Sequence, residues 1–178
     1  MVDPSSLTLP ARRIQIVMTC SLVLLSASMA GLVVAAATMP VTVGETLARL
    51  GGFAAGPMAA WQSAALTGIA AMHLAVWIVL FGVARLVFAH MADGAPDLAA
   101  RTARTLSHWL WAMLAWGVTS QMIVSVVATW GLGEGERALH LGIGTSELFV
   151  ALSALIAGFM ARAFALGAEL WQDHREVV

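Results

Sequence analysis

The chain has 178 residues and a net charge of −1; 60% of its residues are hydrophobic and only 11% are charged. Soluble domains carry about 25% charged residues, so this composition excludes an ordinary soluble domain. The near-neutral charge also gives no reason to expect direct binding to nucleic acid. We therefore expect one integral membrane domain over residues 1–178.

Four apolar stretches follow one another along the chain, at residues 14–39, 64–89, 109–131 and 148–170. A helix that crosses a hydrocarbon core about 30 Å thick needs about 20 apolar residues. Backbone amides in lipid must also be paired within the segment, which a helix achieves. The sequence predicts an all-α fold, a bundle of four transmembrane helices in contact with the lipid bilayer.

The Arg residues are distributed unevenly between the two sides of these spans, and there is no Lys. If the N-terminus is cytoplasmic, only Arg49 and Arg137 lie on the outer side. The other seven lie on the inner side: Arg12, Arg13, Arg85, Arg101, Arg104, Arg162 and Arg175. The positive-inside rule then predicts that the N-terminus and C-terminus are both cytoplasmic. Much Ala, Gly and Arg without Lys is typical of GC-rich bacterial genomes, so we expect a multi-pass protein of the bacterial cytoplasmic (inner) membrane.

The connection at residues 40–63 is the longest, and it contains a short apolar pattern. Leu47, Leu50 and Phe53 recur at helical spacing, which predicts a short interfacial helix. The Asp-Gly-Ala-Pro segment at residues 93–96 predicts a turn.

Polar residues mark the starts of the last two predicted helices. Asp97 is placed to cap the helix that enters the third span. Thr145 or Ser146 is expected to start the last helix, where Glu147 is favourable near the positive end of the helix dipole.

Small residues recur at four-residue intervals in the first and last spans, which predicts close packing of helices in lipid. The sequence leaves open whether the contact is within the bundle or with a partner helix. The rows are Ala27, Gly31 and Ala35, then Ala154 and Gly158, and beside them Ala157, Ala161 and Ala165.

His73 lies inside the second span, about nine residues from its predicted outer end. An ionisable group at this depth is costly and faces the bundle interior or a cavity. Matching depths across the second and third spans places Gln121 and Ser125 opposite it. We expect a polar interior in which neutral His73 hydrogen bonds to one of these residues. A path for protons or a small substrate past His73 is the alternative, which would suit a carrier or channel.

The histidines also raise the question of haem or pigment binding. His90 and His108 lie near the inner edge, whereas His73 and His140 lie towards the outer side. Axial ligands need rigid helix positions that point at one another, and His90 and His140 fall at or within loops. We expect no cofactor, and a haem- or pigment-binding subunit of a redox or light-harvesting complex stays as the alternative.

The motifs of common catalytic and metal sites are absent from the sequence. There is no Cys/His cluster with metal spacing, no Gly-rich phosphate loop and no pair of carboxylates within the spans. We expect a protein that is not an enzyme.

Two segments resemble a family of small bacterial four-helix membrane proteins known only as a domain of unknown function. One runs from Arg85-Leu86-Val87-Phe88 through Gly94 to Ala100-Arg101 and Leu106. The other runs from Ala163 through Phe164, Gly167 and Glu169-Leu170 to Val177-Val178. Members are often encoded beside a helix-turn-helix regulator, so the resemblance implies a membrane sensor or regulatory partner, and it carries no catalytic residues.

These observations predict a regulatory or accessory membrane component that contacts a membrane-protein or cytoplasmic regulatory partner. Its contact face is expected to lie on the cytoplasmic side, with Arg101, Arg104, Asp173 and Arg175 among its residues.

Overall fold

The computed structural model describes residues 5–53, 58–130, 139, 142 and 144–176; within these, side chains are described from Arg12 to Gly167 and at Glu169. This part of the chain forms five helices and no strand. They are α1 (Ser5–Thr38), α2 (Pro40–Leu50), α3 (Ala60–Ala92), α4 (Pro96–Thr129) and α5 (Thr145–Glu176).

Four helices are long and apolar enough to cross a membrane. The membrane-length segments are Arg12–Thr38, Ala60–Ala92, Pro96–Thr129 and Thr145–Gly167. The predicted all-α fold with four spanning helices is therefore confirmed, and the chain has the form of a multi-pass membrane protein. Each helix begins before its predicted apolar stretch, because polar residues at the membrane surface continue a helix without a hydropathy signal, whereas α1 and α4 end slightly short of the prediction.

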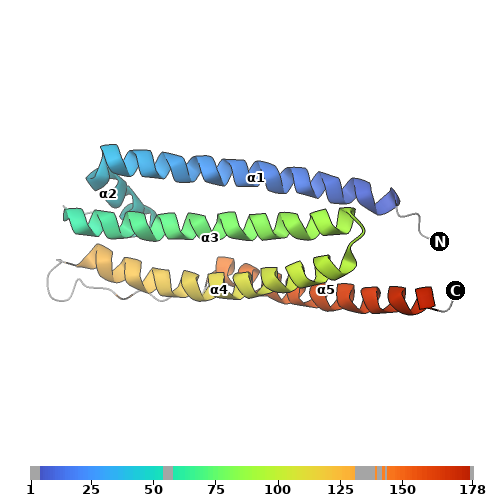
Figure 1. Ribbon diagram of the computed structural model, residues 1–178. Helices are drawn as coiled ribbons and strands as arrows, with labels where there is room; N and C mark the ends of the chain where they lie inside the picture. The colour runs from blue at the N-terminus through green and yellow to red at the C-terminus, as the bar shows by residue number, and fades with distance from the viewer. Residues whose placement is uncertain (1–4, 54–57, 131–138, 140–141, 143, 177–178) are drawn as a thin grey trace.

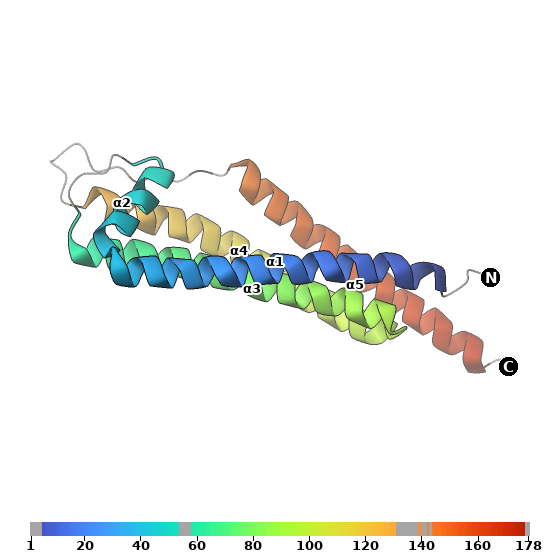
Figure 2. The ribbon, with the colours of Figure 1, turned by 90° about the horizontal axis from the view of Figure 1, so that it is seen from above.

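The long helices pack as a row in chain order (Figure 1). Within the described residues, α1 packs on α3, α3 on α4, and α4 on α5, while the short α2 packs on α3 and α1. Seen from above, α5 crosses α4 obliquely (Figure 2). Both termini lie at one end, which we call the termini end: the first turns of α1 and α4 and the last turns of α3 and α5. The opposite end carries α2, and we call it the α2 end.

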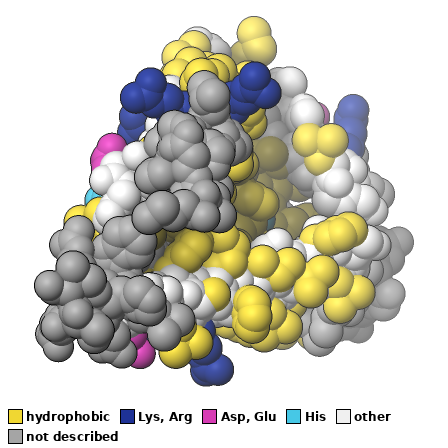
Figure 3. Space-filling model, turned by 90° about the vertical axis from the view of Figure 1, so that its right-hand side faces the viewer, with side chains coloured by type: hydrophobic (Ala, Val, Ile, Leu, Met, Phe, Trp, Pro, Cys, Tyr) yellow, Lys and Arg dark blue, Asp and Glu magenta, His cyan; other side chains and the backbone are white. Residues whose placement is uncertain are grey.

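The Arg side chains are concentrated at the termini end, and Figure 3 looks onto that end and shows basic side chains at separate points of it. Arg49 lies instead on α2. The exposed Arg residues on the elements of the termini end are Arg12, Arg13, Arg85, Arg101, Arg104 and Arg162.

The predicted short helix between the first two spans is confirmed as α2, and Phe53 lies just beyond its end. Gly44 and Ala48 are buried where α2 meets α3. A Cβ atom at Gly44 would lie 2.5 Å from Ser63 Oγ and 2.7 Å from Ser63 Cα, so only glycine allows this approach. The Ser63 hydroxyl donates to the Pro40 carbonyl, which joins the start of α2 to α3.

The prediction that Asp97 caps α4 is wrong. The N-cap is Ala95, and Pro96 opens the helix with Asp97 in its first turn. Pro suits the first helical position because its fixed φ is helical and its missing N–H has no partner there. The predicted start of the last helix is confirmed at Thr145, with Glu147 in the first turn.

Candidate functional site: a cavity between α1, α2, α3 and α4

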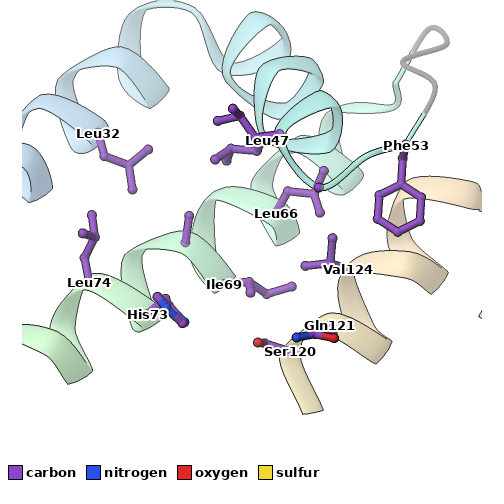
Figure 4. Close-up of a pocket in the computed structure, with 13 residues that line it drawn as sticks. Leu32, Leu47, Phe53, Leu66, Ile69, His73, Leu74, Ser120, Gln121 and Val124 are labelled. Carbon is purple, nitrogen blue, oxygen red and sulfur yellow. The ribbon is translucent and has the colours of Figure 1, made fainter. Parts of the chain in front are cut away.

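A cavity of about 650 Å³ lies between four helices in the half of the molecule that carries α2. Leu32 of α1 and Leu47 of α2 lie on one side of it, and residues of α3 and α4 lie on the other (Figure 4). Leu50 also lines the cavity and is 81% exposed, so the cavity is open to its surroundings beside α2.

The α3 wall is one face of a helix. Its lining residues are Leu66, Ile69, Ala70, His73 and Leu74. They recur at intervals of three and four residues, which puts them on one side of the helix. Four of the five are apolar, so this wall suits an apolar ligand.

The polar groups of the cavity lie together. His73 on α3 and Ser120 and Gln121 on α4 line the same side, across from Leu32 and Leu47 (Figure 4). His73 is 13 residues beyond the start of α3 at Ala60, about 20 Å along the helix. It is therefore deeper than the predicted nine residues from the end of the span.

Gln121 is held by the start of α5. Its Nε2 donates to Glu147 Oε1 at 2.8 Å, and its Oε1 accepts from the Gly142 amide at 3.4 Å. Glu147 Oε2 accepts from the Gly144 amide at 2.7 Å and from the Ser146 hydroxyl at 2.9 Å. These bonds fix the Gln121 amide at the edge of the cavity, and they add Glu147 to the residues around it.

The predicted hydrogen bond between His73 and Gln121 or Ser125 is not made. Gln121 is bonded to Glu147, and the buried Ser125 hydroxyl donates to the Met122 carbonyl at 2.8 Å. Ser120 likewise donates within its own helix, to the Gly117 carbonyl at 2.9 Å. Within the described chain, the His73 imidazole makes no hydrogen bond.

His73 also lines a second, smaller cavity of about 120 Å³. That cavity includes Trp77 and Met113 and reaches Glu147 at the start of α5. The imidazole therefore stands between the large cavity and the polar contacts of α5. One of its nitrogens can donate a hydrogen bond and the other can accept one when the ring is neutral.

The other histidines do not join this site. His90 is half-buried near the end of α3, and His108 is exposed on α4. His140 lies outside the described residues. No group of three or more His, Cys, Asp or Glu side chains able to hold a metal ion occurs in the described part of the chain.

The predicted contact face is only partly described. Arg101 and Arg104 are exposed on the first turns of α4, at the termini end. The side chains of Asp173 and Arg175 lie outside the described residues.

No family model, no curated protein and no solved structure matches this chain.

Proposed function

We propose that this protein is a non-enzymatic membrane sensor or accessory component that binds a neutral amphiphilic small molecule. The observation that supports this most is the cavity of about 650 Å³, which has mainly apolar walls and is lined on one side by His73. An apolar cavity with a few convergent polar groups is the usual form of a small-molecule site.

The chemistry of the lining defines the class of ligand. Leu and Ile side chains suit an aliphatic or ring body, and a free imidazole suits a carbonyl or hydroxyl head. Among the described residues no Arg or Lys lines the cavity, so a charged head would lose its hydration without gaining a counter-charge there. The ligand is therefore uncharged, with one hydrogen-bonding end.

A bound ligand would affect the position of α1. Leu32 contributes the α1 side of the cavity, while the remaining described walls belong to α2, the residues just after it, α3 and α4. An occupant would bridge these elements, and α1 extends from there to Arg12 and Arg13 at the termini end. At that end Arg85 Nε donates to Thr19 Oγ1 at 3.1 Å, which couples α3 to α1.

The charge distribution indicates the side of the membrane on which a regulatory partner would bind. An excess of Arg at the termini end is expected of a cytoplasmic side, in a bacterial inner membrane with both termini inside. A regulatory partner would contact this side, through Arg101 and Arg104 and the segment that includes Asp173 and Arg175. This orientation can be tested by fusing to the C-terminus a reporter enzyme that is active only in the cytoplasm.

The uninterrupted helices favour a sensor over a carrier. Secondary transporters bind substrates at broken helices near the membrane midplane. Here α3 and α4 continue as helices past His73 and Gln121.

Photolabelling tests the cavity directly. The purified protein is exposed to a long-chain alcohol that carries a diazirine, and the labelled residues are mapped by mass spectrometry. We expect label on α3 and α4 around Ile69 and Val124. Ala70→Trp fills the cavity and should abolish this label, while Met72→Trp places the same ring on the outside, since Met72 is 52% exposed and does not line the cavity.

His73→Leu should weaken labelling about fivefold, because one hydrogen bond contributes about 1 kcal/mol. Equal labelling of wild type and A70W would show that the probe only samples bulk lipid, and would contradict the proposal. An absorption spectrum of the same preparation is the second readout: a Soret band lost in H73L would favour the haem-binding alternative instead.

A further inference from the structure

A second concave site lies between α4 and α5, towards the termini end. It has a volume of about 290 Å³ and does not share residues with the His73 cavity. Its main lining residues are Ser107, Trp111, Leu155, Gly158, Phe159 and Arg162.

Close packing of the two helices forms the floor of this crevice. The buried Ser107 hydroxyl donates to the Ala154 carbonyl at 2.9 Å. A Cβ atom at Gly158 would lie 3.3 Å from Ser107 Oγ, so the helices nearly touch here. The larger side chains Trp111 and Phe159 are 42% and 74% exposed, and they form outward-facing apolar walls.

Arg162 supplies a positive charge to these walls. The other α5 residues that line the crevice all precede it in the chain: Ala154, Leu155, Gly158 and Phe159. Arg162 follows Gly158 by four residues, so it lies on the same face of α5 and lines the crevice with the apolar residues before it. It therefore adds a positive charge to one end of the apolar walls.

No protein group neutralises this charge in the described part of the chain. Arg162 forms no hydrogen bond or ion pair there, and neither Asp93, Asp97 nor Glu169 pairs with it. A charge within an apolar span is costly and usually has a partner. The five N–H donors of a guanidinium match the oxygens of a phosphate, which they bind in a two-point geometry.

We propose that this crevice binds the phosphate-bearing headgroup of an anionic membrane lipid. Arg162 holds the phosphate, and Trp111 and Phe159 contact the glycerol and the first part of the acyl chains. Basic pockets between transmembrane helices are suited to such headgroups. A lipid fits better than free phosphate, because a free anion would lose hydration beside two aromatic walls and gain a single cation.

Native mass spectrometry of the full-length protein, released from micelles that contain phosphatidylglycerol and phosphatidylcholine, tests this. We expect wild type to retain phosphatidylglycerol in preference to phosphatidylcholine. Arg162→Gln should retain it roughly tenfold less, as expected for the loss of a charge-assisted contact. Arg104→Gln is the matched control, because Arg104 is an exposed Arg of the same end that does not line the crevice. It should leave retention near the wild-type value.

Thermal unfolding in lipid-free detergent distinguishes the two sources of phosphate. Short-chain phosphatidylglycerol should raise the Tm of wild type but not of R162Q, and inorganic phosphate should leave both unchanged. An equal shift with inorganic phosphate would show a simple anion site and overturn the lipid assignment. An equal loss of lipid in R104Q and R162Q would show only general attraction to a basic surface, and it would also overturn the proposal. Arg162→Lys, which keeps the charge but loses the two-point geometry, should fall between wild type and R162Q.

Discussion

Helices α1 and α5 both contain small residues at four-residue intervals, but the two rows differ in their packing. Each has small residues four apart, Ala27 and Gly31 in α1 and Ala154 and Gly158 in α5. On α5, Ala154 is fully buried and Gly158 faces Ser107. On α1, no residue of the most apolar window is buried, and a Cβ atom at Gly31 would meet nothing within 4 Å. A row of small residues therefore permits close approach in lipid without determining which helix approaches.

The chemistry of the neighbouring helix explains the difference. On its α5 side, α4 presents the Ser107 hydroxyl, which reaches the Ala154 carbonyl directly. Nearer the termini end, Ala103 of α4 and Ala161 of α5 form a buried cluster with Val87 of α3. On α1, Ala27 and Gly31 are both exposed within the described structure.

The largest expected effect is from overpacking this cluster with Ala161→Phe. Ala161 is 2% exposed, so a ring there would push α4 and α5 apart. We expect the free energy of unfolding in micelles to fall by about 1–3 kcal/mol. Ala163→Phe adds the same ring on the exposed side of α5 and should change little. Equal losses in the two variants would show that the α4–α5 contact does not stabilise the fold.

A smaller effect is expected at the α2 end, where the side-chain amide of Gln62 joins α3 to the end of α4. Gln62 Nε2 donates to the carbonyls of Val127 and Trp130, both at 2.9 Å, and its Oε1 accepts from the Ala59 amide at 2.8 Å. Gln62→Leu removes the three hydrogen bonds of this buried side chain, which should cost about 1–2 kcal/mol.

Detergent unfolding monitored by Trp fluorescence measures the Gln62→Leu effect. Thr119→Val is its control, because the exposed Thr119 hydroxyl donates only within its own helix, to Ala115. A cost in T119V as large as in Q62L would mean that the bridge between α3 and α4 contributes nothing specific.

Ser107→Ala tests the polar part of the α4–α5 contact and should have a still smaller effect. Hydrogen bonds between transmembrane helices contribute about 0.6 kcal/mol on average. Ser153→Ala removes a hydroxyl that donates only to Phe149 of its own helix, so it should be neutral. The difference between the two variants, measured by the same unfolding assay, gives the contribution of the contact across helices. A value near zero would assign the contact to van der Waals packing alone.

The sequence predicted the four spanning helices because the bilayer imposes a length of about 20 apolar residues. It underestimated where the helices begin: α1 starts at Ser5 and α3 at Ala60. Residues at the membrane surface extend a helix through local hydrogen bonding. These turns are polar, so the hydropathy of the sequence does not indicate them. The α2 helix was predictable because its apolar residues recur at helical spacing.

The candidate site was predictable only in part. Depth matching placed Ser125 level with His73 and Gln121 one turn away, whereas Gln121 and not Ser125 lines the cavity with His73. Gln121 instead donates its hydrogen bond to Glu147, because the first turn of α5 lies against α4 at this height. Where the first turn of α5 meets α4 depends on the crossing of these two helices. Counting residues along each span does not predict that crossing. Ser125 lies one turn further along, and its hydroxyl bonds within α4.

The smallest expected effect completes the comparison between α1 and α5. Gly31→Leu adds a large side chain where the described chain leaves open space, so the free energy of unfolding of the isolated protein should change by less than about 0.5 kcal/mol. Replacing Gly within a helix is also mildly favourable, which would make any change a small gain. Gly158→Leu, at the equivalent place in α5, should be clearly destabilising, because its Cβ already lies 3.3 Å from Ser107 Oγ. A large loss of stability in G31L would mean that α1 packs against another surface in the micelle, and chemical cross-linking of a cysteine at residue 27 would then show whether that surface belongs to a second copy.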